Sequence, residues 1–436
     1  IFINKKTKEP LRDQKVIDRI AAIYEKQGSD CWFTDDKKVF LGDEHDPNDY
    51  VKLNDIVEVW FDSGSTHSFV LEKRKDLKWP ADMYLEGSDQ HRGWFHSSLL
   101  ESCGTRGRAP FKSILSHGFV VDGKGLKMSK STGNVISPEE ILKDYGADIL
   151  RVWVASSDYA EDLRIDKSIL TQHAESYRKI RNTFRFILGN LKDNYEKQDL
   201  KKLDFKKFNE LEQYVLHKLF IIDKSVKDNL KNYNFHKLYK ELLNFCTLDL
   251  SSFYFDIRKD VLYCDSINSK KRKDCVIILN IVLECLLKWF APILVFTSDE
   301  IYNLLEKKDE SIHEHIFVEV PANWKNDELN NKWVKLFKIK QEANIAIEEK
   351  RSNKEIGSSL EAEIKIKINN KNFDLLEGID LAEYFITSKA EKIKSNNQEE
   401  LKIEVKKTIG TKCIRCWKIL EKNCTRCEEV MLENTK

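Results

Sequence analysis

The sequence has no long apolar run and almost no net charge. Hydrophobic residues make up 41% of its 436 residues, and no apolar run approaches the ~18 residues that span a bilayer. Lys and Arg number 73 against 72 Asp and Glu, so any affinity for nucleic acid must come from local patches. These absences exclude a membrane protein and a histone-like basic protein. They predict a soluble, globular chain of about two to four domains.

Cysteine is too sparse for a disulfide-rich scaffold. Six of the ten cysteines are scattered in apolar or mixed surroundings, namely Cys31, Cys103, Cys246, Cys264, Cys275 and Cys285. We expect these six to be reduced, buried thiols in a cytoplasmic protein. The chain begins Ile1-Phe-Ile-Asn4, without an initiator Met or the apolar segment of a signal peptide, so we expect a fragment of a longer protein.

Glycine and proline are scarce after residue 146, where only four of 16 Gly and two of seven Pro occur. Between residues 147 and 291 only Gly189 interrupts a pattern of apolar residues spaced three and four apart, which predicts a helical bundle. Upstream, short β-branched or aromatic runs at 55–61 and 83–85 predict strands, and they alternate with helical segments such as 94–101. That alternation is typical of an α/β domain.

The region after Pro321 changes pattern twice. Residues 329–351 predict a long charged amphipathic helix, and the period-two alternation of residues 362–369 predicts a half-buried antiparallel strand. We interpret this region as a small α+β module. The Lys- and Asn-rich stretches near 191–207 and 391–408 predict exposed surface or loops.

The segment Lys127-Met-Ser-Lys-Ser131 places a lysine pair on a predicted loop, which Thr132-Gly-Asn134 closes. Two lysines three positions apart on a loop flanked by Gly and Ser can swing inward together. They would then spread positive charge over the leaving oxygens of a polyphosphate. The loop therefore fits nucleotidyl transfer, and the alternative is an exposed polar loop whose lysines are only solvated.

This segment matches the KMSKS signature of class I aminoacyl-tRNA synthetases, and three further motifs in the expected order resemble isoleucyl-tRNA synthetase. The three are Val59-Trp-Phe-Asp-Ser-Gly-Ser65, Tyr84-Leu-Glu-Gly-Ser-Asp-Gln-His-Arg-Gly-Trp-Phe95 and Ser116-His-Gly-Phe119. The resemblance continues through residues 146–153, 177–183 and 356–362 to the terminal cysteines, so it covers nearly the whole chain. Valyl and leucyl enzymes are the nearest rivals, but the first two motifs favour the isoleucyl member.

The resemblance implies a ligase that joins isoleucine to the α-phosphate of ATP, expels pyrophosphate and passes the acyl group to tRNA-Ile. It implies that Lys130 contacts ATP and, with Lys127 and Mg²⁺, stabilises the α-phosphate and the departing pyrophosphate. The aminoacyl-adenylate contacts that it implies are Glu86, Gly87, Asp89 and Gln90. Trp60 and Trp94 correspond to walls of the isoleucine pocket, although without the resemblance both would be ordinary core aromatics.

One family motif is missing. The HIGH-type motif, which binds the ATP phosphates near the N-terminus of these enzymes, has no counterpart among the ten histidines. The resemblance places that motif and the valine-editing module upstream of residue 1, so we expect this chain alone to form no adenylate. A non-catalytic tRNA-binding paralogue or module with a structural zinc site is the alternative. The lysine pair argues against that alternative, and the missing motif argues for it.

Two C-x-x-C pairs close the sequence, Cys413/Cys416 and Cys424/Cys427. Two such turns can present four thiolates to one ion, which is typical of a closed structural Zn²⁺ site. A disulfide pair is disfavoured by the cytosolic cysteine usage, and a redox pair by the lack of thioredoxin-like context. We expect the metal to fold the tail and to present four side chains, Arg415, Trp417, Lys418 and Arg426. By resemblance, such a knuckle assists the engagement of tRNA.

The helical region resembles an anticodon-binding bundle. Four basic residues recur on one predicted helix and fit phosphates, but they are equally consistent with a solvated face; they are Arg178, Lys179, Arg181 and Arg185. The family further suggests a monomer with tRNA-Ile, isoleucine and ATP as partners and no membrane.

The predicted fold class is multidomain, with an α/β, partial Rossmann-like core followed by a helical bundle, a small α+β module and a zinc knuckle. The expected domains are the end of a connective insertion (1–55), the C-terminal half of the catalytic domain with the KMSKS loop (56–154), a helical anticodon-binding domain (155–328), a small α+β junction module (329–410) and a Cys₄ zinc knuckle (411–436).

Overall fold

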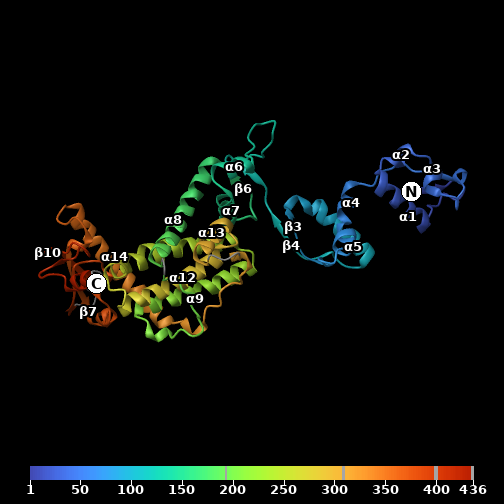
Figure 1. Cartoon of the computed structure of the whole chain (residues 1–436). Helices are drawn as coiled ribbons and strands as arrows, with labels where there is room; N and C mark the ends of the chain where they lie inside the picture. The colour runs from blue at the N-terminus through green and yellow to red at the C-terminus, as the bar shows by residue number, and fades with distance from the viewer. Residues whose placement is uncertain (192–193, 307–309, 397–400, 434–436) are drawn as a thin grey trace. The chain divides into compact units, whose positions relative to one another are not determined.

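The computed structural model describes residues 1–191, 194–306, 310–396 and 401–433. The chain forms two compact units, Ile1–His117 and Gly118–Lys436 (Figure 1). None of the helices in the described ranges combines the length and the apolar character that a bilayer crossing requires.

The first unit opens with a small helical part closed by two antiparallel strands. Its elements are β1 (Phe2–Asn4), α1 (Gln14–Gln27), α2 (Cys31–Thr34), α3 (Lys37–Leu41) and β2 (Tyr50–Lys52), with β1 paired to β2. The core surrounds Trp32, whose ring centroid lies 5.1 Å from that of Phe2 and 5.0 Å from that of Phe40. Cys31 is buried in this core, as expected.

The remainder of the first unit contains a β–α–β crossover. Strands β3 (Ala81–Gly87) and β4 (Phe111–His117) pair in parallel, and α5 (Trp94–Arg106) connects them. The strand predicted at 83–85 and the helix predicted to begin at residue 94 are therefore confirmed. The prediction that Cys103 is buried is wrong, because this residue lies on the exposed side of α5.

The prediction of a strand at 55–61 is also wrong. Helix α4 (Val59–Gly64) begins inside this run, because the Glu58 carboxylate accepts a hydrogen bond from the backbone N–H of Trp60 at 2.7 Å. Ile56 is 82% exposed. A β-branched run favours a strand only where a neighbouring strand and a core cover it, and here neither does.

The second unit begins with two parallel strands and two short helices. These elements are β5 (Val120–Asp122), α6 (Pro138–Asp144), α7 (Ala147–Ser156) and β6 (Leu163–Ile165), with β5 paired to β6. The loop that carries the lysine pair lies between β5 and α6.

A helical bundle follows and confirms the pattern-based prediction. Its helices are α8 (Lys167–Leu191), α9 (Glu210–Lys231), α10 (Phe235–Asn244), α11 (Asp256–Cys264), α12 (Lys270–Phe290), α13 (Val295–Glu306) and α14 (Asp327–Ser352). The segment Phe245–Phe255 between α10 and α11 is π-helical. Helices α9 and α12 lie side by side (Figure 1), and α12 is buried on most of its surface. Helix α14 confirms the amphipathic helix predicted at 329–351.

A three-stranded sheet and a cysteine-rich tail complete the second unit. Their elements are β7 (Ala362–Asn369), α15 (Asn370–Phe373), α16 (Leu381–Tyr384), β8 (Lys389–Ser395), β9 (Leu401–Lys407), β10 (Thr411–Lys412), β11 (Ile419–Leu420) and α17 (Thr425–Glu433). Strand β7 is central, parallel to β8 and antiparallel to β9. Its buried and half-exposed residues alternate, which confirms the period-two prediction.

Of the two alternatives predicted near 391–408, loops are wrong where the structure describes the region, because β8 and β9 occupy most of it, whereas exposed surface is confirmed, since only Val405 and Thr408 of the described residues there are buried. Both strands form ion pairs with the central strand β7, as in Glu391 with Lys365 at 2.6 Å, Glu404 with Lys367 at 2.8 Å and Lys389 with Glu363 at 3.5 Å. Such cross-strand pairs let a lysine-rich segment remain a strand. Residues 397–400 lie outside the described residues.

Candidate nucleotide site and cysteine cluster

The end of β3 carries the candidate adenylate contacts of the first unit. Glu86 and Gly87 lie opposite Ser116 and His117 of β4, at the carboxyl ends of two parallel strands. Open α/β sheets bind their ligands at this end of the strands. The Glu86 side chain is exposed, and its Oε2 accepts a hydrogen bond from the Gly87 backbone N–H at 3.2 Å.

The two other candidate contacts lie on the 3-10 turn Ser88–Arg92 that follows β3. The Gln90 Oε1 accepts a hydrogen bond from the Trp94 backbone N–H at 2.9 Å, so this amide caps the start of α5. Its Nε2 donates to Asp89 Oδ2 at 3.3 Å, and Asp89 is exposed. The structure therefore brings all four candidate residues to one end of the β–α–β crossover.

Trp60 and Trp94 also lie within the first unit, and each has a defined packing. The Trp60 side chain is 45% exposed and lies against Gly93, where an added Cβ would be only 3.1 Å from its ring. The Trp94 ring stacks on Tyr84 at 4.2 Å, and its Nε1 donates to the Ser63 carbonyl at 2.9 Å. Trp60 thus offers an open aromatic face, whereas Trp94 is half-buried and hydrogen-bonded.

The lysine loop of the second unit is held by Asp122 and Asn134, to which the sequence-based prediction assigned no catalytic role. Asp122 Oδ1 accepts from the backbone N–H groups of Lys124 at 3.0 Å and Leu126 at 2.8 Å. Asp122 Oδ2 accepts from the Asn134 side chain at 2.9 Å. This side-chain hydrogen bond, followed by the backbone N–H groups, lowers the pKa of Asp122 below its usual value.

Asn134 binds the loop from its far end. Its Oδ1 accepts from the Ser129 backbone N–H at 2.9 Å and the Thr132 hydroxyl at 2.6 Å, and its Nδ2 also donates to the Lys127 carbonyl at 3.2 Å. The side chains of Lys127 and Lys130 are exposed. The loop is therefore shaped by Asp122 and Asn134, of which the sequence indicated Asn134 only as part of the segment that closes the loop.

The four terminal cysteines converge. Their Sγ atoms all lie within 4.8 Å of one another, and those of Cys416 and Cys424 are 3.8 Å apart. A tetrahedral ion with Zn–S bonds of ~2.3 Å requires sulfur separations of about 3.8 Å, so this donor set fits Zn²⁺. Although burial raises it, backbone N–H groups of Cys416 and Arg415 lower the pKa of Cys413 to about 7. A low pKa favours the thiolate that a metal requires.

Comparisons with known proteins give one consistent family. Residues 1–166 match the family model of the tRNA synthetases class I (I, L, M and V), and residues 212–366 match that of the anticodon-binding domain of tRNA ligase. The isoleucine–tRNA ligase of Pelagibacter ubique is 62% identical over 426 residues, which are 98% of this chain and 47% of that protein. The chain belongs to the class I tRNA synthetase family.

A second relative shows the same partial coverage. The isoleucine–tRNA ligase of Zymomonas mobilis is 42% identical over 444 residues, or 99% of this chain and 46% of that protein. This class I synthetase chain thus spans about half the length of the curated relatives it matches. A solved LeuRS of Agrobacterium radiobacter K84, in a ternary complex with tRNA and LeuAMS, has a similar fold. Its TM-score is 0.52 at 15% identity, over 74% of this chain and 36% of that one.

The predicted fold class of the synthetase chain is confirmed, since the α/β core, the helical domain, the small sheet module and a four-cysteine cluster that can hold zinc are all present. The basic residues predicted on one helix lie on α8, and all four side chains are exposed; they are Arg178, Lys179, Arg181 and Arg185. Arg181 also forms a long ion pair with Glu300 at 3.7 Å.

The expected display of the knuckle side chains is wrong for three of the four. Arg426 forms a bidentate pair with Asp260 at 2.7 and 3.0 Å, Lys418 lies 3.9 Å from the same carboxylate, and Arg415 donates to backbone carbonyls of α11. Only Trp417 of the four is turned outward, at 61% exposure. Sequence spacing alone could not show this, because Asp260 lies more than 150 residues away in the chain.

Proposed function

We propose that this chain is the C-terminal part of an isoleucine–tRNA ligase. The ligase would join the isoleucine carboxylate to the α-phosphorus of ATP, releasing pyrophosphate, and then transfer the acyl group to tRNA-Ile, releasing AMP. The observation that carries the proposal is the 62% identity to an isoleucine–tRNA ligase along 98% of the chain.

In this proposal Lys127 and Lys130 stabilise the negative charge that develops on the α-phosphate and on the departing pyrophosphate. Their ammonium groups are exposed on a loop whose backbone is already ordered by Asp122 and Asn134. Positive groups that are fixed before the reaction stabilise a transition state without reorganisation at the moment of reaction. Mg²⁺ bound with ATP would neutralise further phosphate charge.

The first unit supplies the binding groups. Glu86 would accept hydrogen bonds from the isoleucine ammonium or the ribose hydroxyls, and Asp89 and Gln90 would bind polar edges of the adenylate. Gly87 is buried here, with the Asp89 carboxylate where a side chain would be, and the proposal assigns to it a close approach of the ligand to the backbone. The open face of Trp60 and the ring of Trp94 would form the apolar wall for the isoleucine side chain.

The sheet of this core is incomplete within residues 1–117, all of which the structure describes. Strands β3 and β4 form a two-stranded parallel sheet, and Leu85 and Ile114 on them are 54% and 37% exposed. A two-stranded sheet with exposed apolar residues is marginal alone. We infer that further strands, with the phosphate-binding HIGH-type motif, come from the part of the relatives that this chain does not span.

The second unit is proposed to bind tRNA-Ile through the exposed basic face of α8, with the cysteine cluster holding one structural Zn²⁺. The domain boundaries 1–55, 56–154, 155–328, 329–410 and 411–436 stay predictions. We also propose a monomer in a reducing cytoplasm. The basis for the reducing compartment is that five of the six scattered cysteines are buried free thiols.

The direct test is amino-acid-dependent exchange of pyrophosphate into ATP by the full-length protein, with isoleucine, valine and leucine compared. We expect the strongest exchange with isoleucine. Lys130→Ala should lower it about 10²- to 10³-fold, as loss of one preorganised electrostatic group does. Lys124→Ala, in the preceding turn, is the matched control and should retain wild-type exchange, because its backbone N–H, which binds Asp122, is kept.

Three outcomes would each contradict one part of this proposal. No exchange with any of the three amino acids, from folded full-length protein, would leave the tRNA-binding module as the better reading of the chain. Equal activity of Lys130→Ala and wild type would remove the lysine loop from the chemistry. Measurable exchange by residues 1–436 alone would contradict the inference that the core is incomplete.

A further inference from the structure

The two C-x-x-C turns carry an arginine at the same position, and both arginines contact helix α11. Arg415 precedes Cys416 and Arg426 precedes Cys427. Arg415 donates to the carbonyl oxygens of Cys264 and, at 2.9 Å, of Tyr263, which are among the orphan carbonyls at the C-terminus of α11.

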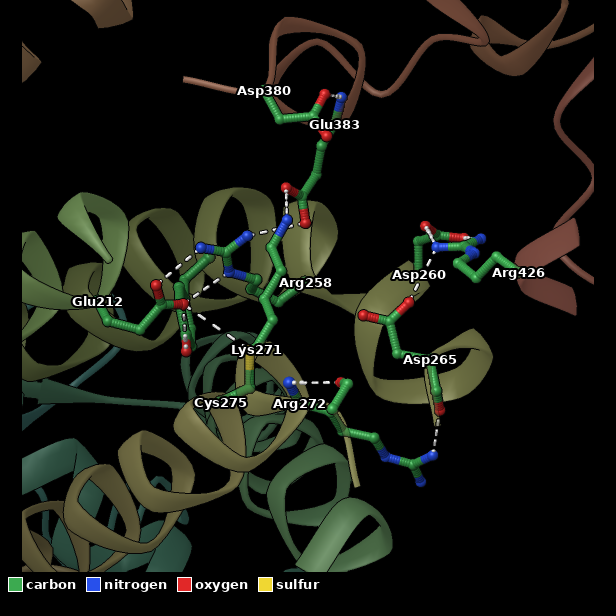
Figure 2. Close-up of polar contacts among 12 residues, drawn as sticks. Glu212, Arg258, Asp260, Asp265, Lys271, Arg272, Cys275, Asp380, Glu383 and Arg426 are labelled. Atoms are coloured by element: carbon green, nitrogen blue, oxygen red, sulfur yellow. Dashed lines mark hydrogen bonds and ion pairs between the residues drawn. The ribbon is translucent and has the colours of Figure 1, made fainter. Parts of the chain in front are cut away.

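Arg426 binds the acidic side of the same helix. Its guanidinium donates two hydrogen bonds to the Asp260 carboxylate, the bidentate pair described above. It also donates to Asp265, the C-terminal cap residue of α11, at 3.1 Å (Figure 2). The knuckle therefore places two cations against a helix end where the helix dipole is negative. Both guanidinium groups are directed toward the bundle.

Helix α11 also holds the small sheet module, through a different residue. Arg258 is 3% exposed and binds Glu212 of α9 at 2.6 and 2.7 Å and Glu383 of α16 at 2.8 Å (Figure 2). Lys271 of α12 donates to the other oxygen of Glu383. Residues two apart on a helix do not share a face, so Arg258 and Asp260 serve different neighbours from one short helix.

A third contact joins the knuckle to the sheet module directly. The Ile419 backbone N–H on β11 donates to Ser388 Oγ at 2.7 Å, and this hydroxyl donates to the Leu360 carbonyl. Bundle, sheet module and knuckle are thus linked pairwise in a closed cycle. In a closed cycle each contact restricts the geometry of the other two, so weakening one lowers the stability of all three.

We propose that metal binding by the four cysteines orients Arg415 and Arg426 onto α11 and thereby fixes the sheet module, as well as the knuckle, on the helical bundle. The two arginines are positioning residues that act through α11. Within the tail, one ion shared by both C-x-x-C turns fixes the two guanidinium groups relative to each other. This coupling goes beyond the ligase activity and is independent of it.

Hydrogen exchange of the complete chain tests the coupling without tRNA, ATP or amino acid. Backbone amides of α11 and of the segment 380–387 are followed by mass spectrometry in zinc-loaded and chelator-treated protein. We expect zinc removal to speed exchange in both segments by about tenfold, although neither contains a metal ligand. An effect confined to residues 411–433 would overturn the proposal.

Variants separate the arginines from the metal. Arg415→Gln/Arg426→Gln should show the fast exchange at 380–387 while still binding one Co²⁺ with a thiolate charge-transfer band. Lys422→Gln, exposed between the two C-x-x-C pairs, is the matched control and should exchange like wild type. Wild-type exchange in the double variant would refute the role of the arginines.

Asp260→Asn weakens the same contact with Arg426 from the side of the bundle and leaves the knuckle sequence intact. It should reproduce the fast exchange at 380–387 with metal still bound. If the arginine variant failed to bind Co²⁺, Asp260→Asn alone would decide, and wild-type exchange in it would overturn the proposal. Failure of pyrophosphate exchange would leave these results unaffected, so the two ideas fail separately.

Discussion

Replacing Arg258 with Met should strongly destabilise the helical bundle. Arg258 and Glu212 have side chains only 4% and 0% exposed, and the guanidinium supplies the two shortest hydrogen bonds to that carboxylate. Without it, the described residues leave Glu212 with the Tyr254 hydroxyl at 3.3 Å and the Cys275 thiol at 3.8 Å, which are neutral donors. Glu383 is less affected, because Lys271 still binds it.

The expected loss follows from the uncompensated charge. Breaking a buried ion pair by removing one partner costs about 3 to 5 kcal/mol, much more than the pair contributes relative to an apolar replacement. Glu212→Gln in the Arg258→Met background removes that charge, so the double variant should be more stable than Arg258→Met alone, by about 2 kcal/mol.

The assay is urea unfolding followed by circular dichroism at 222 nm, with all variants compared at one pH. Arg351→Met is the matched control; its partner Glu348 is exposed, so a loss within about 1 kcal/mol is expected. Two results would refute the reasoning. One is an Arg258→Met midpoint indistinguishable from that of the control, and the other is a further loss on adding Glu212→Gln.

Three further changes have defined outcomes. Burial lowers the pKa of Lys340 to about 8, and the Asp256 charge opposes this shift. The charged form of Lys340 therefore destabilises the fold fully below pH 8, and this destabilisation is relieved as the pH rises toward the pKa of lysine in the unfolded chain. Relative to Lys340→Met, the wild type should therefore gain about 2 kcal/mol in unfolding free energy between pH 7 and pH 9.5, and a pH-independent difference would contradict this. Asn134→Ala should speed tryptic cleavage after the loop lysines by about tenfold through loss of its hydrogen bonds, whereas Val135→Ala should be cleaved like wild type. Cys416→Ser should lose the one-equivalent Co²⁺ thiolate band that Cys264→Ser, beside the cluster, retains; equal spectra would exclude a Cys₄ site.

The local sequence pattern correctly predicted the elements in which the residues packed around a segment favour the same structure as the segment's own sequence. The alternation of residues 362–369 survives as β7 because one face of the strand is buried. The two C-x-x-C pairs converge because each turn already brings its own two sulfurs close together. Both patterns are visible within a few residues of the sequence, although β7 itself pairs with strands that lie farther along the chain.

One failure has a local cause and two have long-range causes. The run at 55–61 is rich in strand formers, yet a single carboxylate cap at Glu58 starts a helix in it. The stretch 391–408 is stabilised as strands by pairing with β7, whose Lys365 and Lys367 bind Glu391 and Glu404, and the composition of the stretch does not show this partner strand. The inward direction of Arg426 depends on Asp260, whose proximity only the folded chain establishes. The roles of the candidate adenylate and ATP residues stay predictions.

In the lysine loop, the residues that hold the backbone are different from the residues proposed to act on the phosphates. Its shape depends on one aspartate, one asparagine and backbone amides, while the two lysine side chains extend into solvent and contribute little to holding it. Mutational tolerance should therefore divide along the same line. A change at either lysine alters what the loop can do while preserving its form, whereas a change at Asp122 or Asn134 alters its form while preserving every charge that would face a phosphate.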